Sequence, residues 1–378
     1  MRIHFTCLLL LIACATPSIL AEETFRTDTS EDEKLPWYQT EPGQFPPEGS
    51  AHYFAGELVG KDHVHRTGTI RVSRTDKQRR SHWDLPIDFR LLPYGSLAYH
   101  GSPATLKDIP IGTHLHGLWY VKDEGEETKS LFYNRKSIEA DFTKVFRLVD
   151  DFTYYQEKNR LWQVENVDLK EMKLQLVGQA EGEDKPTVIA LDLTPATRVY
   201  LGKQIASLKD IEPGQKVLFN LTWATLYGVG RCTDLWLDEE SRQIAQAQQL
   251  AQHRLHQKDR GLAGIIDAVD NQKRILTVTL FGGIDAGLFD DLKPKSTAQV
   301  CVSEPTLQIY DQVNDKKGGP ILSVDPIEKQ PGSSGIQVRV QTSLLLEGYR
   351  PGRIVRIFPS GWPIVALPEE ETLWPERD

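Results

Sequence analysis

Short runs of β-branched and other apolar residues alternate along this chain with polar stretches rich in glycine, proline and charged side chains. Residues 54–59 and 68–72, for example, are two such runs joined by a polar segment. Runs of this length bounded by turn-forming residues are typical of β-strands, and two of them flanking a short polar segment favour a hairpin. The pattern predicts a mainly β protein.

The same unit occurs three times, which is the signature of an internal repeat. Its opening hairpins begin near residues 54, 161 and 261. Each unit ends in a Pro/Gly turn and a β-rich strand, and the turn glycines are Gly112, Gly214 and Gly352. About five strands in roughly 70–100 residues fit a small closed or partly open barrel. We therefore expect three tandem small OB-like β-barrels joined by helical connectors.

Two motifs carry most of the repetition. One ends the opening strand, as in residues 264–270, and the other is the SLKDIEPGQKV segment at residues 207–217. Both resemble motifs of a class of exported bacterial repeat domains of unknown function, over about residues 54–360. The match is incomplete, because Trp162 replaces the first glycine in repeat two, residues 110–112 depart from the second motif, and repeat three lacks its Lys-Asp pair. The resemblance implies an OB-like barrel and brings no active site with it.

The N-terminus has the pattern of a secretory signal peptide at residues 1–21. A basic residue is followed by an apolar run, Pro17 and a small residue before two glutamates, and the run is shorter than the roughly 20 residues that span a bilayer. We therefore expect the protein to be exported and to be periplasmic, cell-surface or extracellular. Cys14 also lies in a segment that resembles a bacterial lipobox, so an N-terminal lipid anchor is an alternative to cleavage after Ala21.

Polar and helical segments are expected to connect the barrels. The predicted order is signal peptide 1–21, disordered spacer 22–50, barrel 1 at 51–122, helical connector 123–157, barrel 2 at 158–237, linker helix 238–259, barrel 3 at 260–362 and tail 363–378. Apolar residues at helical spacing between Phe142 and Phe152 predict the connector helix. In the linker helix, Asp238 is a candidate N-cap and Gly261 a stop signal. The expected apolar stripe of that helix is Ile244, Ala247, Ala251 and Leu255.

The charge and the cysteine content of the chain limit its possible functions and its compartment. The 378 residues include 44 basic and 53 acidic side chains, a net charge of −9, which argues against general nucleic-acid binding. Cleavage after Ala21 would leave only Cys232 and Cys301. An oxidising compartment would allow them to form a disulfide between two repeats, and two free buried thiols are the alternative.

Histidine is unevenly distributed, with seven of its ten occurrences between residues 52 and 116. Two His-x-His pairs stand out, because side chains two apart in a strand share a face and could bind one metal ion. The candidate metal ligands are His63, His65, His114 and His116. Alignment of the repeat glycines places Leu115 in the barrel core, so His114 and His116 should face solvent or a neighbouring domain. Two ordinary exposed histidines are the alternative, and no other cofactor is expected.

Other candidate chemistry is weaker. Asp150-Asp151, Asp290-Asp291 and the Glu369–Glu371 run are adjacent acidic residues, whose side chains diverge rather than form a catalytic pair; the C-terminal run is expected to be a solvated tail. No nucleophile elbow, P-loop or HExxH motif occurs. Repeated tryptophans, such as Trp119 and Trp223, are expected to serve packing rather than a ligand platform.

These observations favour an exported, non-enzymatic binding or scaffolding protein of the cell envelope, with an envelope protein or a polysaccharide as its partner. The first alternative is a metal-handling protein that uses the histidine pairs of barrel 1. The second is an envelope hydrolase with its active site in a cleft between barrels.

Overall fold

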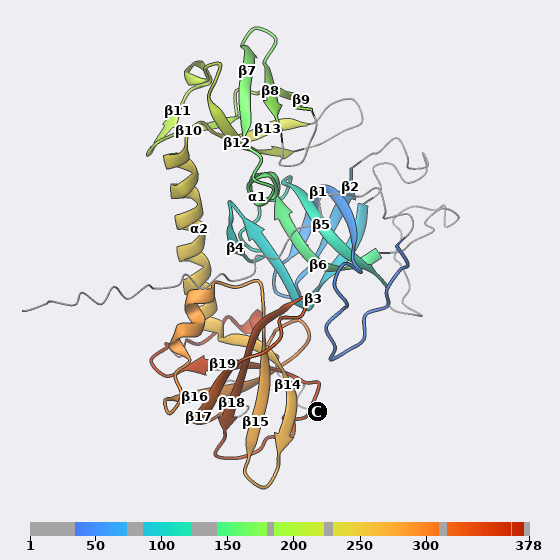
Figure 1. Ribbon diagram of the computed structural model, residues 1–378, viewed down its shortest axis with the longest axis vertical. Helices are drawn as coiled ribbons and strands as arrows, with labels where there is room; N and C mark the ends of the chain where they lie inside the picture. The colour runs from blue at the N-terminus through green and yellow to red at the C-terminus, as the bar shows by residue number, and fades with distance from the viewer. Residues whose placement is uncertain are drawn as a thin grey trace, which may run out of the picture.

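The computed structural model describes residues 35–73, 86–122, 142–179, 185–222, 230–309, 316–363 and 365–373. The predicted signal peptide, and residues 22–34 of the predicted spacer, lie outside these ranges. The predicted fold class is confirmed: the chain is mainly β and forms three closed barrels. Figure 1 shows that their order in space differs from their order in the sequence, because barrel 1 lies between barrel 2 and barrel 3.

Barrel 1 has the strand arrangement expected of an OB-like fold. Its strands are β1 (His52–Asp62), β2 (Thr67–Val72), β3 (Pro86–Tyr99), β4 (Ser102–Ala104), β5 (His114–Val121) and β6 (Phe142–Asp150). The ring closes in the order β1-β2-β3-β6-β5, with β3 and β6 parallel and the other neighbours antiparallel. A buried apolar cluster that includes Leu58, Leu115 and Trp119 fills it.

The helix expected between Phe142 and Phe152 is wrong, because residues 142–150 form strand β6. Its residues are buried on both faces: Val145 and Leu148 lie in the core of barrel 1, whereas Phe146 packs at the contact with barrel 3. A strand that is covered on both sides carries apolar residues on both faces, so it lacks the alternation of an exposed strand and its apolar spacing can be mistaken for that of a helix. The helix that does follow, α1 (Asp151–Glu157), is short and is capped by Asp150.

Barrel 2 repeats this topology, whereas barrel 3 rearranges it. Barrel 2 consists of β7 (Trp162–Asp168), β8 (Lys173–Gly178), β9 (Thr187–Asp192), β10 (Arg198–Leu201), β11 (Gln204–Ala206), β12 (Lys216–Thr222) and β13 (Arg231–Trp236). Barrel 3 consists of β14 (Leu262–Asp270), β15 (Ile275–Phe281), β16 (Thr297–Ser303), β17 (Lys316–Pro326), β18 (Ser333–Gln341) and β19 (Ile354–Pro359). In barrel 3 the neighbours are all antiparallel, and β16 occupies the place beside β19 that the last strand, β6 or β13, takes in the other two.

The repeated glycines make the same contact in all three barrels. Each has a positive φ and donates its N–H to a carbonyl of the opening strand, next to a β-bulge. The bonds join Gly112 to Leu58 (2.7 Å), Gly214 to Val164 (2.8 Å) and Gly352 to Ile266 (2.8 Å). The sequence repeat is therefore a repeat of backbone geometry, which explains why its motifs contain turn residues.

The linker helix is confirmed as α2 (Glu239–Arg260), with Asp238 accepting a hydrogen bond from the Ser241 N–H and Gly261 following its end. The predicted apolar stripe is wrong, because Leu255 is 68% exposed. The buried positions are instead Ser241, Ala245, Gln249 and His253. This face lies on barrel 1, where glutamine side chains donate to backbone carbonyls of the β3–β4 hairpin. Figure 1 shows α2 running from barrel 2 past barrel 1 to barrel 3.

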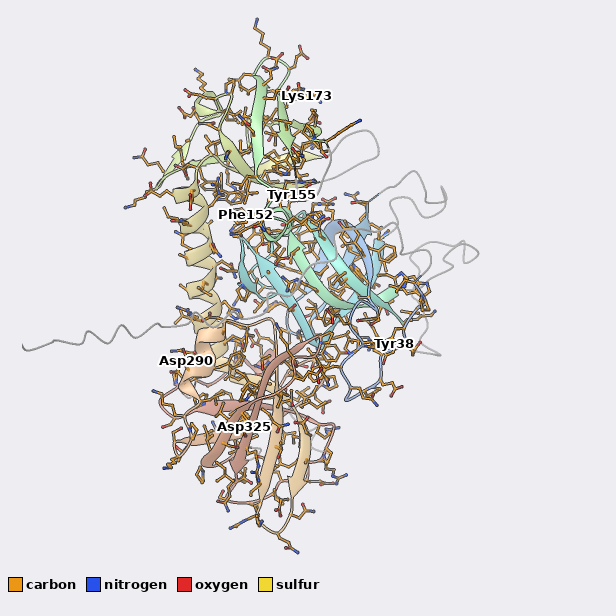
Figure 2. The ribbon with its side chains drawn as sticks, viewed as in Figure 1. Tyr38, Phe152, Tyr155, Lys173, Asp290 and Asp325 are labelled. Carbon is orange, nitrogen blue, oxygen red and sulfur yellow. The ribbon has the colours of Figure 1, made fainter. Side chains whose placement is uncertain are left out.

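Two segments expected to be solvated pack on the barrels. In the predicted spacer, the Phe45 ring lies 5.3 Å from that of Tyr94 in barrel 1 and 6.1 Å from that of Phe281 in barrel 3. Figure 2 shows Tyr38, from the same segment, close to this junction. In the predicted tail, Glu371 forms an ion pair with Arg260 at 2.6 Å. Both segments therefore join parts of the molecule that are distant in sequence.

The structure distinguishes between the alternatives that the sequence left open for the cysteines and the tryptophans. Cys232 and Cys301 are buried thiols in different barrels and are not joined by a disulfide. Trp119 and Trp162 are buried in barrel cores, as the packing interpretation predicts, whereas Trp223 lies outside the described residues. Among the residues that the structure describes, no helix is both long and apolar enough to cross a bilayer.

Candidate functional site

A cavity of about 120 Å³ lies where barrel 1, the C-terminal half of α2 and barrel 3 meet. Its walls come from the β1–β2 turn and β3 of barrel 1, from one face of α2, and from loops of barrel 3. On α2 the lining residues are His253, His256, Gln257 and Arg260. Their spacing of three and four places them on one side of a helix.

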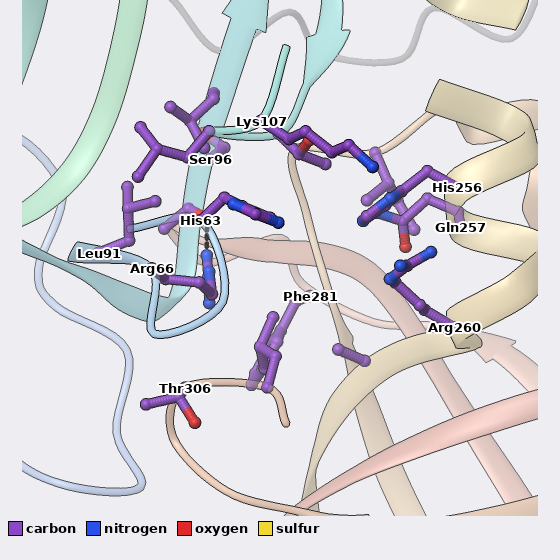
Figure 3. A pocket seen from close by; sticks show the side chains of 18 of the residues that line it. His63, Arg66, Leu91, Ser96, Lys107, His256, Gln257, Arg260, Phe281 and Thr306 are labelled. Carbon is purple, nitrogen blue, oxygen red and sulfur yellow. Dashed lines mark hydrogen bonds between the residues drawn. The ribbon is translucent and has the colours of Figure 1, made fainter. Parts of the chain in front are cut away.

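Basic side chains dominate this lining. The cationic or potentially cationic residues are His63, Arg66, Lys107, His253, His256, Arg260 and Arg356, whereas the one carboxylate of the described lining is Glu371. In Figure 3, His63 and Arg66 lie across the cavity from His256 and Arg260, with Phe281 and Thr306 on a third side. Because Glu371 already pairs with Arg260, the other charges give the cavity a positive excess.

Arg66 and Arg356 carry most of this excess. The Arg66 guanidinium donates to the carbonyls of Pro93 (3.2 Å) and Gly95 (2.9 Å). That of Arg356 donates to the carbonyls of Leu307 (2.9 Å) and Arg260 (2.8 Å). Carbonyl oxygens satisfy the N–H groups but do not neutralise the charge.

The electrostatics reflect this lack of counter-charge. Burial, together with repulsion by Arg356, lowers the pKa of Arg66 to about 9. Burial and the neighbouring Arg260 lower the pKa of Arg356 to about 10. Both remain charged at neutral pH. Burial also lowers the pKa of His253 to about 4, so that this side chain is neutral there.

The four predicted metal ligands are divided between two places. His63 and His65 lie in the β1–β2 turn rather than on a strand face, and the His65 Nδ1 lies 2.6 Å from the Asp62 carboxylate. His63 lines the basic cavity. His114 and His116 are buried at the other end of barrel 1, facing the neighbouring barrel, and therefore do not join the first pair.

The second pair meets Asp151, the first residue of α1. The Asp151 Oδ1 lies 2.8 Å from the His114 Nδ1 and 2.9 Å from the His116 Nε2. Burial alone would raise the pKa of Asp151, but the two histidines hold it well below its usual range. Burial lowers the pKa of His116 to about 4, and Asp151 outweighs burial to raise that of His114.

Asp150 and Asp151 have separate roles although they are adjacent. Asp150 caps α1 and accepts a hydrogen bond from the Asn220 side chain of barrel 2 at 2.8 Å. Asp151 faces the histidines of barrel 1 and accepts from the Leu221 N–H of barrel 2 at 2.9 Å. Figure 2 places the neighbouring Phe152 and Tyr155 at this junction.

Sequence reasoning missed the arginines of the cavity, because Arg66, Arg260 and Arg356 come from three distant segments that share no motif. The sequence also offered no reason to pair Asp151 with histidines, because it is adjacent to another acid and its partners, His114 and His116, lie on β5. The repeat alignment did identify the outward direction of His114 and His116. Comparisons of the chain with protein-family models, with curated proteins and with solved structures found no match.

Proposed function

We propose that this protein is an exported, non-enzymatic binding protein of the cell envelope, and that the cavity between barrel 1, α2 and barrel 3 binds an anionic group of its ligand. The observation that carries the proposal is the positive excess of the cavity, where the half-buried Arg66 and the buried Arg356 lie beside carbonyl groups. The signal-peptide pattern of residues 1–21 supports export.

Electrostatics and size indicate the kind of group that fits. A buried guanidinium that lacks an anionic partner is costly, so an anion between Arg66 and Arg356 would stabilise both. A volume of about 120 Å³ accommodates one compact group, such as a phosphate or the carboxylate of an acidic sugar. Leu91, Phe281 and Ile284 add apolar surface to the lining, which suits a ligand whose anionic group is attached to a less polar body.

The same lining is a poor match for the hydrolase alternative. A glycosidase-type mechanism needs two carboxyl groups across the scissile bond, and Glu371, the one acid of the described lining, is held by Arg260. Binding is therefore the function that this cavity supports best.

Calorimetric titration of the full chain at low ionic strength tests the proposal. The ligands are inorganic phosphate, citrate and an oligosaccharide of uronic acids, so that free anions are distinguished from acidic glycans. We expect saturable binding of at least one ligand, weakened by added salt. Affinity should fall at least tenfold in Arg66→Gln, and by less in Lys107→Gln, whose side chain is exposed and whose loss should not affect folding.

The control is Arg339→Gln, which removes an exposed arginine of β18 outside the cavity and should leave affinity unchanged. The proposal is wrong if no ligand binds saturably, or if Lys107→Gln and Arg66→Gln bind as the parent does.

A further inference from the structure

A second group of side chains, apart from the basic cavity, is arranged as metal ligands are. His114, His116 and Asp151 are all buried, and each offers a ligand atom within 4.8 Å of the other two. They come from two elements, because the histidines are two apart on β5 and the aspartate begins α1. The strand geometry places both imidazoles on the same side, towards α1.

The ligand set is specific in its chemistry. Two imidazole nitrogens and one carboxylate oxygen are typical of sites for zinc and other divalent transition metals, whereas calcium and magnesium prefer oxygen alone. We propose that His114, His116 and Asp151 bind one divalent transition-metal ion, through Nδ1, Nε2 and Oδ1 respectively. The proposal is independent of anion binding in the cavity.

The two nitrogen–oxygen distances require only a small adjustment. Ligand bonds of about 2.0–2.1 Å in tetrahedral geometry place the ligand atoms about 3.3 Å apart. The two N···O separations are 2.8 and 2.9 Å, so each must open by about half an ångström.

Each ligand also has a second partner that fixes its orientation. The His114 Nε2 lies 3.1 Å from the Ser73 Oγ, and the His116 Nδ1 lies 2.6 Å from the Tyr53 hydroxyl. The Asp151 Oδ2 accepts from the Leu221 N–H. Outer partners of this kind orient the ligands in metal sites and set the histidine tautomer.

These partners also account for the protons. The metal-binding nitrogens must be unprotonated, so each neutral imidazole carries its proton on the opposite nitrogen. There the His114 Nε2–H donates to the Ser73 Oγ, and the His116 Nδ1–H donates to the Tyr53 oxygen. Binding to neutral rings therefore needs only a change of tautomer, and Asp151 supplies a negative charge to the ion.

The position of the site predicts an effect on the whole chain. Asp151 is bonded to barrel 1 through the histidines and to barrel 2 through Leu221 on β12. An ion on these ligands would hold the two barrels together and stabilise the folded chain in proportion to the logarithm of its concentration.

The test uses the full chain, stripped with a chelator and titrated separately with Zn²⁺, Co²⁺ and Cu²⁺. We expect one ion per chain for at least one metal, a melting temperature that rises with its concentration, and a visible spectrum of the Co²⁺ form that reports nitrogen and oxygen ligands. His116→Ala and Asp151→Asn should each weaken binding at least tenfold.

The matched control is the double variant His63→Ala/His65→Ala, which removes a pair of the same spacing from the β1–β2 turn. It should bind the metal ion as the parent does; anion binding is not its readout, because His63 lines the basic cavity. If His116→Ala fails to fold, the Co²⁺ spectrum and stoichiometry of the parent decide the question. The proposal is overturned if the parent binds no stoichiometric ion, if binding survives loss of His116, or if it depends on His63 and His65.

Discussion

At the scale of single residues, the most informative side chains are ionisable groups held away from water. Arg66 and Arg356 are charged without an acidic partner in the described part of the chain, and His253 is held neutral between α2 and barrel 3. The charge state of each depends on the groups around it, and each lies at a contact between barrels. The sequence marks none of them, since burial is a property of the assembled molecule.

His253 makes stability depend on pH. Its Nε2 accepts a hydrogen bond from the Asp285 N–H of barrel 3, and its Nδ1 has no hydrogen-bond partner among the described residues. In the protonated ring the Nε2–H would face the Asp285 N–H, so that two donors would oppose each other, in agreement with a pKa near 4. Since the unfolded chain takes up this proton near pH 6.5, the contribution is complete above that pH and is lost as the pH falls towards 4.

Denaturant unfolding at pH 7.5 and pH 5.0 measures the effect. Between these two pH values, the free energy of unfolding of the parent should fall by about 2 kcal/mol more than that of His253→Gln. This is the difference expected for a base whose pKa is about 4 in the folded chain and about 6.5 in the unfolded chain. Leu255→Gln, which places the same amide side chain on the exposed side of α2, should keep the parental dependence. Equal pH dependence of His253→Gln and the parent would contradict this role for His253.

At the scale of elements, each barrel depends on a closing turn that bonds to the bulged opening strand. Gly352 shows why glycine is needed there: its φ is +81°, yet a Cβ would meet nothing within 4 Å. The constraint is therefore one of backbone conformation rather than space. The same loop geometry recurs in barrels of different strand order, so the turn is a more constant feature of the repeat than its topology.

Gly352→Ala should accordingly destabilise barrel 3 by about 1–2 kcal/mol, the cost of a left-handed conformation for an L residue. Gly60→Ala is the control, since that glycine lies in β1 with an ordinary backbone conformation and a Cβ there would make only normal contacts with Thr69. It should be neutral or slightly stabilising. The denaturant midpoints of the two variants distinguish backbone strain from the mere addition of a methyl group. Equal midpoints would show that the left-handed conformation of Gly352 is not what requires glycine.

At the scale of the whole molecule, barrel 1 is the central unit, and α2 and the 35–50 segment connect it to barrel 3. The C-terminal Glu371 pairs with Arg260 at the end of α2. The basic cavity exists only because of this arrangement. A chain with a net charge of −9 thus contains a local positive site, since net charge describes the surface as a whole and not the field inside a cleft.

Phe45→Ala tests this arrangement, because the ring contacts Tyr94 of barrel 1 and Phe281 of barrel 3. Loss of the half-buried ring should cost about 2 kcal/mol. It should also increase the radius of gyration in small-angle scattering and weaken anion binding in the cavity. Leu255→Ala, on the exposed side of α2, should change none of these. A compact, fully stable Phe45→Ala variant would show that the segment does not hold the barrels together.

The linear pattern of residues was enough to predict the β class, the three repeats, their turn glycines, α2 with its cap, and the outward direction of His114 and His116. These features depend on local backbone preferences and on periods of two, which a linear pattern preserves. Three features became visible only in the folded molecule: residues 142–150 form a strand, barrel 1 lies between the other two, and Arg66, Arg260 and Arg356 share a cavity. Those outcomes depend on contacts between residues far apart in the chain, and no local pattern contains that information.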